Sequence, residues 1–341
     1  SSARRHALSD ILLRSLGNIG LVYTNLGRYE MAMRNLEESY HIAQEQNDRF
    51  RANRLLINIG NIHLAQGNYP QAMLNYLENT RIAQEIGDRQ GVSMGIGNMG
   101  SVYDYQGEYT AALACTLRNL QISLELGDRP GVAFALWNLG KISLAKRELH
   151  GAEKFLQRAI VLDRLLDTPY ELCEALYTLG KTLAARQHYE EAFRHNHEAL
   201  QIAGEIEYDE IHFQASVGEI RLLHALGRIT REEAIRRLRE VQVRFRDEQS
   251  DDIEAAEVAY RIWKFDPSQE DARQEAARLY RALYKRTPNI EYRYRYKDLT
   301  GEDLPEPPAL PPVPEAVLEG LRPLTALLER VDALIEEVRG E

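Results

Sequence analysis

Residues 97–103 read Gly-Asn-Met-Gly-Ser-Val-Tyr, and related heptads lie forty residues before and after them. The heptad at residues 57–63 reads Ile-Asn-Ile-Gly-Asn-Ile-His. A fixed period of this length predicts an array of stacked supersecondary units. The strictest recurrences are a glycine and, twelve residues later, an alanine: Gly20, Gly60, Gly100, Gly140 and Gly180, with Ala32, Ala72, Ala112, Ala152 and Ala192.

Each unit has the pattern of two antiparallel helices. Apolar residues flank the recurrent glycine at intervals of three and four, which is the spacing of one helix face. Glycine weakens a helix by roughly 1 kcal/mol, so we expect a second helix to cross there too closely for a Cβ atom. Gly107 suits the left-handed end of a first helix, and Asp88 suits the cap of the next one. The sequence therefore predicts an all-α fold.

The Leu-Gly, Tyr, Gly-x-Tyr and Ala pattern resembles the tetratricopeptide repeat family, in its 40-residue form with a Gly-Asp-Arg linker. That form is similar to the repeats of Pins-type polarity adaptors and of bacterial signalling proteins. The resemblance covers about residues 9–250 and implies a right-handed α-solenoid that binds proteins or peptides. This chain departs from the pattern at Arg147 and Gln187, where a turn glycine is expected, and at Thr178, where asparagine recurs.

Composition divides the chain into four segments. Residues 287–301 alternate tyrosine with arginine as a strand would, but Thr-Pro-Asn is a helix start and Gly301 a stop, so a helix fits better. The prolines that follow predict a semi-rigid linker. The expected segments are a tetratricopeptide solenoid of five regular repeats and one degenerate repeat at 1–250, degenerate terminal helices at 251–301, the Pro-rich linker at 302–314 and an amphipathic C-terminal helix at 315–341.

The amphipathic helix carries a short seam of leucine, valine and isoleucine at intervals of four and three. The pattern leaves two alternatives open: the seam pairs with a second chain in a homodimer, or it docks on the last repeats of its own chain. The first residue is Ser1 and not methionine, so we expect the sequence to be a piece of a longer protein.

Charge and hydropathy exclude several classes of partner. The formal net charge is −10, whereas a nucleic-acid-binding module is usually basic. No apolar run reaches the roughly 18 residues of a membrane span.

Cys115 and Cys173 form neither a CxxC pair nor a disulfide framework, which favours a cytoplasmic protein.

The sequence predicts no cofactor and no metal. Gly95, Gly97 and Gly100 match GxGxxG, but they lie in the middle of a helix and follow no strand, so a dinucleotide site is not expected. His195 and His197 are two residues apart and point to different helix faces, whereas a helical zinc pair needs a spacing of four.

The resemblance implies that four positions per repeat face a concave groove: those six, three and two residues before the recurrent glycine, and the one after it. The candidate peptide-binding residues at these positions are Arg14, Asn18, Arg54, Asn58, Asn61, Asn98, Ser101, Trp137, Asn138, Lys141, Tyr177, Lys181 and Arg221.

Two features of these rows suggest a ligand. Asparagine offers donors and an acceptor together, which suits the backbone of an extended peptide, although each amide could instead tie its helix to the next repeat. These rows contain one carboxylate, Glu174, and five cations: Arg14, Arg54, Lys141, Lys181 and Arg221. This excess of positive charge favours an acidic partner; scattered solvated charges are the alternative.

These observations predict a protein- or peptide-binding scaffold or adaptor that is not an enzyme, since no nucleophile–base set or carboxylate pair has a usable spacing. The alternative is an autoinhibitory or sensor arm of a multidomain bacterial signalling enzyme, such as a nucleotide-binding switch, a kinase or a cyclase. Family analogy supports either function only by association.

Overall fold

A computed structural model describes residues 2–245 and 252–340, and within these ranges the regular structure is entirely helical. The sequence pattern also predicts helices over residues 231–246 and 251–264. Their ends Arg246 and Asp251 lie outside the described residues, as do Ser1 and the predicted boundary between residues 250 and 251. The chain separates into two compact units. Unit 1 comprises Ser1–Gly127 and Pro307–Leu321, and unit 2 comprises Asp128–Glu306 and Arg322–Glu341.

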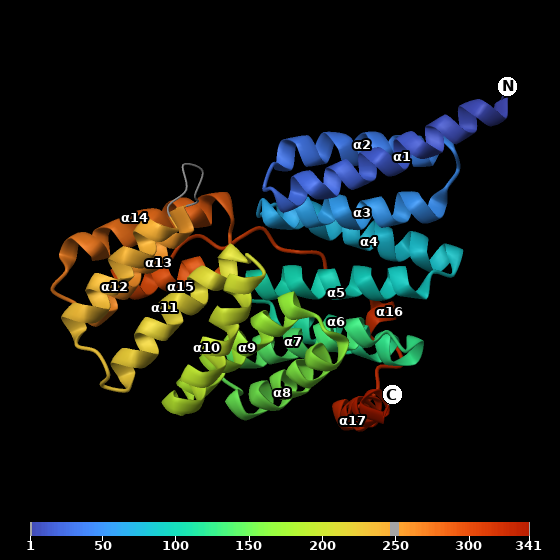
Figure 1. Cartoon of the computed structure of the whole chain (residues 1–341). Helices are drawn as coiled ribbons and strands as arrows, with labels where there is room; N and C mark the ends of the chain where they lie inside the picture. The colour runs from blue at the N-terminus through green and yellow to red at the C-terminus, as the bar shows by residue number, and fades with distance from the viewer. Residues whose placement is uncertain (1, 246–251, 341) are drawn as a thin grey trace. The chain divides into compact units, whose positions relative to one another are not determined.

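Consecutive helices pack in pairs, each with a first and a second helix, which confirms the predicted α-solenoid class (Figure 1). The helices of unit 1 are α1 (Ser2–Asn25), α2 (Tyr29–Glu45), α3 (Arg49–Ala65), α4 (Tyr69–Ile86), α5 (Arg89–Gln106), α6 (Tyr109–Leu126) and the short α16 (Glu315–Leu318). Those of unit 2 are α7 (Arg129–Ala145), α8 (Leu149–Leu166), α9 (Pro169–Ala185), α10 (Tyr189–Glu205), α11 (Asp209–Ala225), α12 (Arg231–Arg244), α13 (Asp252–Phe265), α14 (Glu270–Arg286), α15 (Ile290–Thr300) and α17 (Leu324–Gly340).

The recurrent glycines lie where paired helices cross. A Cβ atom on Gly60 of α3 would come within 2.6 Å of the Tyr76 ring of α4. On Gly140 of α7 it would come within 2.5 Å of the Leu156 side chain of α8. These distances are too short for any larger residue without movement, which confirms the reason predicted for glycine. The alanines twelve residues later are fully buried: Ala32, Ala72, Ala112, Ala152 and Ala192.

The predicted helix ends are also present. Gly107 has a φ of +82°, and the carboxylate of Asp88 accepts a hydrogen bond from the backbone N–H of Gly91 at 2.9 Å. Arg147 and Gln187, the two departures from the turn glycine, adopt the same left-handed backbone with φ of 64° and 66°. This conformation costs a non-glycine residue roughly 1–2 kcal/mol, so packing of the flanking helices must hold it.

The first helices form the inner row of each unit. In unit 1, α1 contacts α3 and α3 contacts α5, and in unit 2, α7 contacts α9 and α9 contacts α11. Among the described residues, neighbouring second helices do not approach each other this closely. Because the closer row lies on the inside of a curved stack, the surface of the first helices is the concave side of each unit, and we call it the first-helix face.

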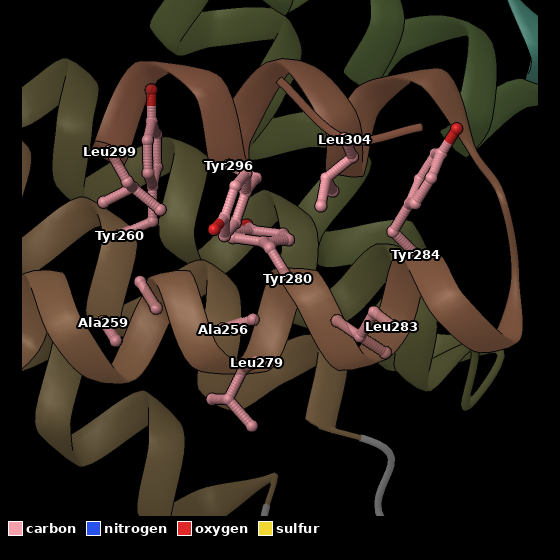
Figure 2. Close-up of a cluster of buried hydrophobic side chains, with 11 residues drawn as sticks. Ala256, Ala259, Tyr260, Leu279, Tyr280, Leu283, Tyr284, Tyr296, Leu299 and Leu304 are labelled. Atoms are coloured by element: carbon pink, nitrogen blue, oxygen red, sulfur yellow. The ribbon is translucent and has the colours of Figure 1, made fainter. Parts of the chain in front are cut away.

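The C-terminal part of unit 2 contains a hydrophobic core rich in tyrosine (Figure 2). Tyr260 of α13 and Tyr280 of α14 have ring centroids 6.1 Å apart in an edge-to-face arrangement. Tyr296 and Leu299 share the buried face of α15. The helix predicted before Gly301 is therefore confirmed, and Gly301 ends it in the left-handed conformation.

The helix predicted over residues 315–341 is interrupted. Helix α16 ends at Leu318, Gly320 has a φ of +65°, and Pro323 directly precedes α17. In unit 1, Tyr103 of α5 donates a hydrogen bond to the carbonyl of Pro311 in the linker at 2.7 Å, and α16 contacts α6.

Helix α17 packs on α8, and not on the last repeats. Val331 and Ile335 of the predicted seam are buried together with Leu327. Arg158 of α8 donates two hydrogen bonds to Asp332, at 2.7 and 2.9 Å. The middle of the apolar face that a homodimer would use is thus covered within the chain, and the homodimer stays a prediction.

The close crossing of α5 and α6 gives a direct test of the repeat register. A Cβ on Gly100 would lie 3.1 Å from Thr116 Oγ1 and 3.3 Å from Cys115 Cβ. Gly100→Leu should therefore lower the free energy of unfolding by about 1–3 kcal/mol through overpacking. Ala65→Leu, at an exposed position of α3, is the control in urea unfolding. Equal losses for the two variants would show that the register is wrong.

Candidate functional site

The structure places every candidate residue on a first helix, but distributes the set between the two units. Unit 1 contains Arg14, Asn18, Arg54, Asn58, Asn61, Asn98 and Ser101, on α1, α3 and α5. Unit 2 contains Trp137, Asn138, Lys141, Tyr177, Lys181 and Arg221, on α7, α9 and α11.

In unit 1 several candidate side chains already have partners. Arg14 forms a salt bridge with Asp10 at 3.2 Å. The amide of Asn98 donates to Asn61 Oδ1 at 3.4 Å, and the hydroxyl of Tyr76 donates to the same oxygen at 2.7 Å. Asn61 therefore links two neighbouring repeats. This agrees with the alternative in which asparagine side chains tie one repeat to the next instead of binding a ligand.

In unit 2 an aromatic and cationic cluster lies on α7 and α9. The Lys141 ammonium is 4.5 Å from the centroid of the Trp137 ring, and Trp137 Nε1 donates to Thr178 Oγ1 at 3.3 Å. The Phe134 ring centroid is 6.0 Å from that of Trp137. This arrangement joins adjacent repeats through side chains of the first-helix face.

Carboxylates lie around this cluster: Glu174, which the predicted rows contain, and Glu210, which they do not. Glu174 accepts a hydrogen bond from the Tyr208 hydroxyl at 2.7 Å. Glu174 is half-buried and Glu210 is exposed; partial loss of hydration raises the pKa of both, while Lys141 opposes the shift. Glu210 lies about one helical turn before the rows taken from the family pattern, so a search one turn wider would have found it.

A small cavity opens between α7, α8 and α9, with a volume of about 20 Å³. On α8, the side chain of Asp163 is only 2% exposed, and the Thr168 hydroxyl lies 3.3 Å from its Oδ1. Burial, with smaller contributions from Glu171 and Glu174, raises the pKa of Asp163 to about 7. The cavity is lined by Ala133, Phe134, Trp137, Asp163, Glu171 and Glu174.

The next part of the first-helix face is cationic. The Lys181 ammonium lies 5.4 Å from the centroid of the Tyr177 ring, and Arg221 is exposed on α11. Loss of hydration, followed by repulsion from Arg261, lowers the pKa of Arg221 to about 10. Arg221 therefore stays charged at neutral pH, in surroundings that would favour an anion.

Ion pairs from the degenerate repeats border this cationic part. Glu257 of α13 accepts hydrogen bonds from Arg261 and from the Tyr280 hydroxyl. Arg295 of α15 lies 3.8 Å from Glu257 and 3.0 Å from Glu291. Burial opposes ionisation of Glu257, but Arg261 and Arg295 outweigh it and lower its pKa. These residues follow the regular repeats, where the forty-residue period no longer assigns a register.

A metal site requires clustered ligands, and a membrane-spanning helix requires a long apolar stretch. Along residues 2–245 and 252–340, no three side chains of His, Cys, Asp or Glu come together as metal ligands would. In the same ranges, no helix combines the length and apolar character that a bilayer crossing needs.

The buried carboxyl of Asp163 predicts a pH-dependent stability. Its pKa rises from an ordinary 3.8 to about 7 on folding, so between these values the unfolded chain is ionised while the folded one keeps its proton. Stability should therefore fall as pH rises from about 4 to about 7. Asp163→Asn should remove this loss and raise the free energy of unfolding at pH 8 by roughly 1–3 kcal/mol.

Urea unfolding at pH 5 and pH 8 measures the effect. Asp271→Asn, at an exposed site on α14, is the matched control. The same pH dependence in the wild type and in Asp163→Asn would contradict the buried ionisation.

Comparison with known proteins identifies the repeats. The chain matches family models described as tetratricopeptide repeat over residues 11–87 and 172–206. No curated protein sequence matches it.

Solved structures with the same fold have low sequence identity to this chain. The apo quorum sensor NprR from B. thuringiensis has 15% identity and a TM-score of 0.62, covering 80% of this chain and 75% of its own. A Rap protein complexed with Competence and Sporulation Factor has 15% identity and a TM-score of 0.59, covering 84% and 76%. A signal transduction ATPase with a tetratricopeptide repeat sensor, from Pyrococcus horikoshii, has 17% identity and a TM-score of 0.56; the match covers 81% of this chain but 42% of that one.

The two repeat matches, the forty-residue recurrence of glycine and alanine, and the paired helices agree with one another. The chain therefore contains tetratricopeptide repeats, at residues 11–87 and 172–206.

Proposed function

We propose that unit 2 binds an extended peptide on its first-helix face, and that a carboxylate of the peptide docks at Lys181 and Arg221. One observation carries this proposal. Among the described residues, neither cation forms a salt bridge, whereas the nearby Arg261 and Arg295 are both paired with glutamates.

A carboxylate ligand fits the local electrostatics. Arg261 and Arg295 repel Arg221. Glu257 attracts it, and a further negative group would offset more of the repulsion. Guanidinium binds carboxylates through two parallel hydrogen bonds, and each charge-assisted hydrogen bond contributes about 1.5–3 kcal/mol. An acidic ligand therefore remains part of the proposal, with the cationic contact assigned to Lys181 and Arg221.

The asparagine of the row in unit 2 is not assigned to the ligand. Asn138 is buried, and its amide donates a hydrogen bond to the Phe134 carbonyl at 3.2 Å.

The placement of the aromatic side chains supports an extended ligand. Lys181 is on α9 and Arg221 is on α11, and these two first helices are in contact. Tyr177, one helical turn before Lys181, offers a flat apolar surface beside the cation. A peptide that runs across the two helices can therefore meet a charge and an aromatic ring in the same repeat.

Tetratricopeptide repeats are protein-interaction scaffolds, and the similar Rap structure contains a bound factor. We infer that this chain acts as a binding scaffold and has no catalytic activity of its own. The second candidate function is that of a sensor arm in a larger signalling enzyme. It is favoured by the likeness to the sensor-bearing ATPase, of which the chain spans less than half.

Charge reversal tests the proposed function. Peptides selected from a random phage-displayed library would be titrated by calorimetry against the wild type and against Lys181→Glu with Arg221→Glu. The double variant should bind at least about 100-fold more weakly, since two charge-assisted contacts are replaced by repulsion.

The control is Lys154→Glu with Arg194→Glu, which makes the same change of charge at exposed positions of the second helices α8 and α10. It should bind like the wild type at equal salt. If the selected peptides bind both double variants equally well, the first-helix face of unit 2 does not recognise a carboxylate.

A further inference from the structure

We propose that the cavity between α7, α8 and α9 is a second subsite of unit 2, which takes one primary ammonium group from the peptide, either a lysine side chain or the free amino terminus. The inference rests on the proposed peptide binding and adds a second, oppositely charged contact to it. We call this cavity the ammonium pocket; it is lined by Ala133, Phe134, Trp137, Asp163, Glu171 and Glu174.

The size of the pocket selects the group. Its volume of about 20 Å³ has room for about one water-sized group. An ammonium is a compact point charge of that size, whereas a guanidinium is planar and larger. The pocket is therefore too small for an arginine head group or for a quaternary ammonium.

Asp163 supplies an oxygen without a partner. The side chain is 98% buried, since its exposed fraction is 2%, and it lines the pocket. Its hydrogen bond from Thr168 goes to Oδ1, and among the described residues no donor reaches Oδ2. In a side chain with so little exposed surface, a carboxylate oxygen without a donor is costly, so an ammonium donor in the pocket would remove that cost.

The charges around the pocket are not balanced within unit 2. Asp163, Glu171 and Glu174 line it, and Glu210 lies close enough to Glu174 to raise its pKa. The cation that acts on Glu174 and Glu210 is Lys141, whose ammonium lies over the Trp137 ring. Above pH about 7, where Asp163 is ionised, one ammonium thus faces four carboxylates, and a second ammonium would bring the site closer to neutrality.

The aromatic walls fit the same ligand. Trp137 and Phe134 line the pocket together with the carboxylates. The faces of aromatic rings attract cations, tryptophan most strongly, and apolar walls exclude the water that would otherwise screen the charge. Glu174 also belongs to the wall, and the Tyr208 hydroxyl fixes its carboxylate at 2.7 Å.

The fluorescence of Trp137 reports binding directly. The chain has two tryptophans, so Trp263→Phe leaves Trp137 as the single reporter. Methylammonium chloride is the probe, with potassium chloride as the ionic-strength control and tetramethylammonium chloride as the oversized control. Methylammonium should give a saturable change that neither control gives.

Variants assign the signal to the pocket. Asp163→Asn and Glu174→Gln, each in the Trp263→Phe background, should weaken methylammonium binding at least tenfold. Lys181→Glu with Arg221→Glu should leave methylammonium binding unchanged. A failure of the ammonium pocket can thus be told apart from a failure of the carboxylate subsite. No saturable change, or equal binding by Asp163→Asn, would overturn the ammonium pocket.

Two modified peptides then distinguish the source of the ammonium. A library-selected peptide would be titrated after acetylation of its amino terminus, and separately with each lysine replaced by norleucine. The change that removes the bound ammonium should raise Kd at least tenfold for the wild type and much less for Asp163→Asn. If neither change raises Kd, peptides do not use the pocket, and the proposal is overturned even where the carboxylate contact holds.

Discussion

The close crossing of two helices at one glycine per repeat is the constraint on which the rest of the structure depends. At Gly60 and Gly140 there is no room for a Cβ atom, so the rotation of each first helix about its axis is fixed by its partner. That rotation decides which side chains pack inward on the second helix and which face the inner row. Side chains next to the glycine, such as Trp137 and Lys181, therefore lie on the first-helix face whatever residue type occupies the position.

This constraint explains why so much of the fold could be predicted. The glycine, the buried alanine, the left-handed turn and the aspartate cap are local features with strong sequence preferences, and they recur in register. Even Arg147 and Gln187, which break the pattern, adopt the turn conformation, because the flanking helices impose it. The break in the C-terminal helix was missed because the apolar spacing continues across Pro323, although a proline there predicts a boundary.

The candidate site was harder to predict. The rows taken from the resemblance place Lys181 and Arg221 on the expected helices, but they leave out Glu171 and Glu210, which lie about one turn earlier. Asp163 belongs to a second helix, and its burial depends on α7 and α9 packing around it, which no local pattern encodes. Glu257 and Arg295 follow the regular repeats, so the period assigns them no register. The sequence predicted a cationic strip with Glu174 as its one carboxylate; the structure instead has several carboxylates near Trp137 and the cations Lys181 and Arg221 further along the face.

Such a division of charge suits a ligand that must bind in one direction, because opposite charges at two subsites penalise the reversed orientation. The central claim is that the first-helix face of unit 2 is the binding surface. Hydrogen–deuterium exchange of the whole chain, with and without a library-selected peptide, tests it most directly. The account predicts that added protection falls on the first helices α7, α9 and α11. Protection confined to the second helices α8, α10 and α12, with the first helices unchanged, would contradict it.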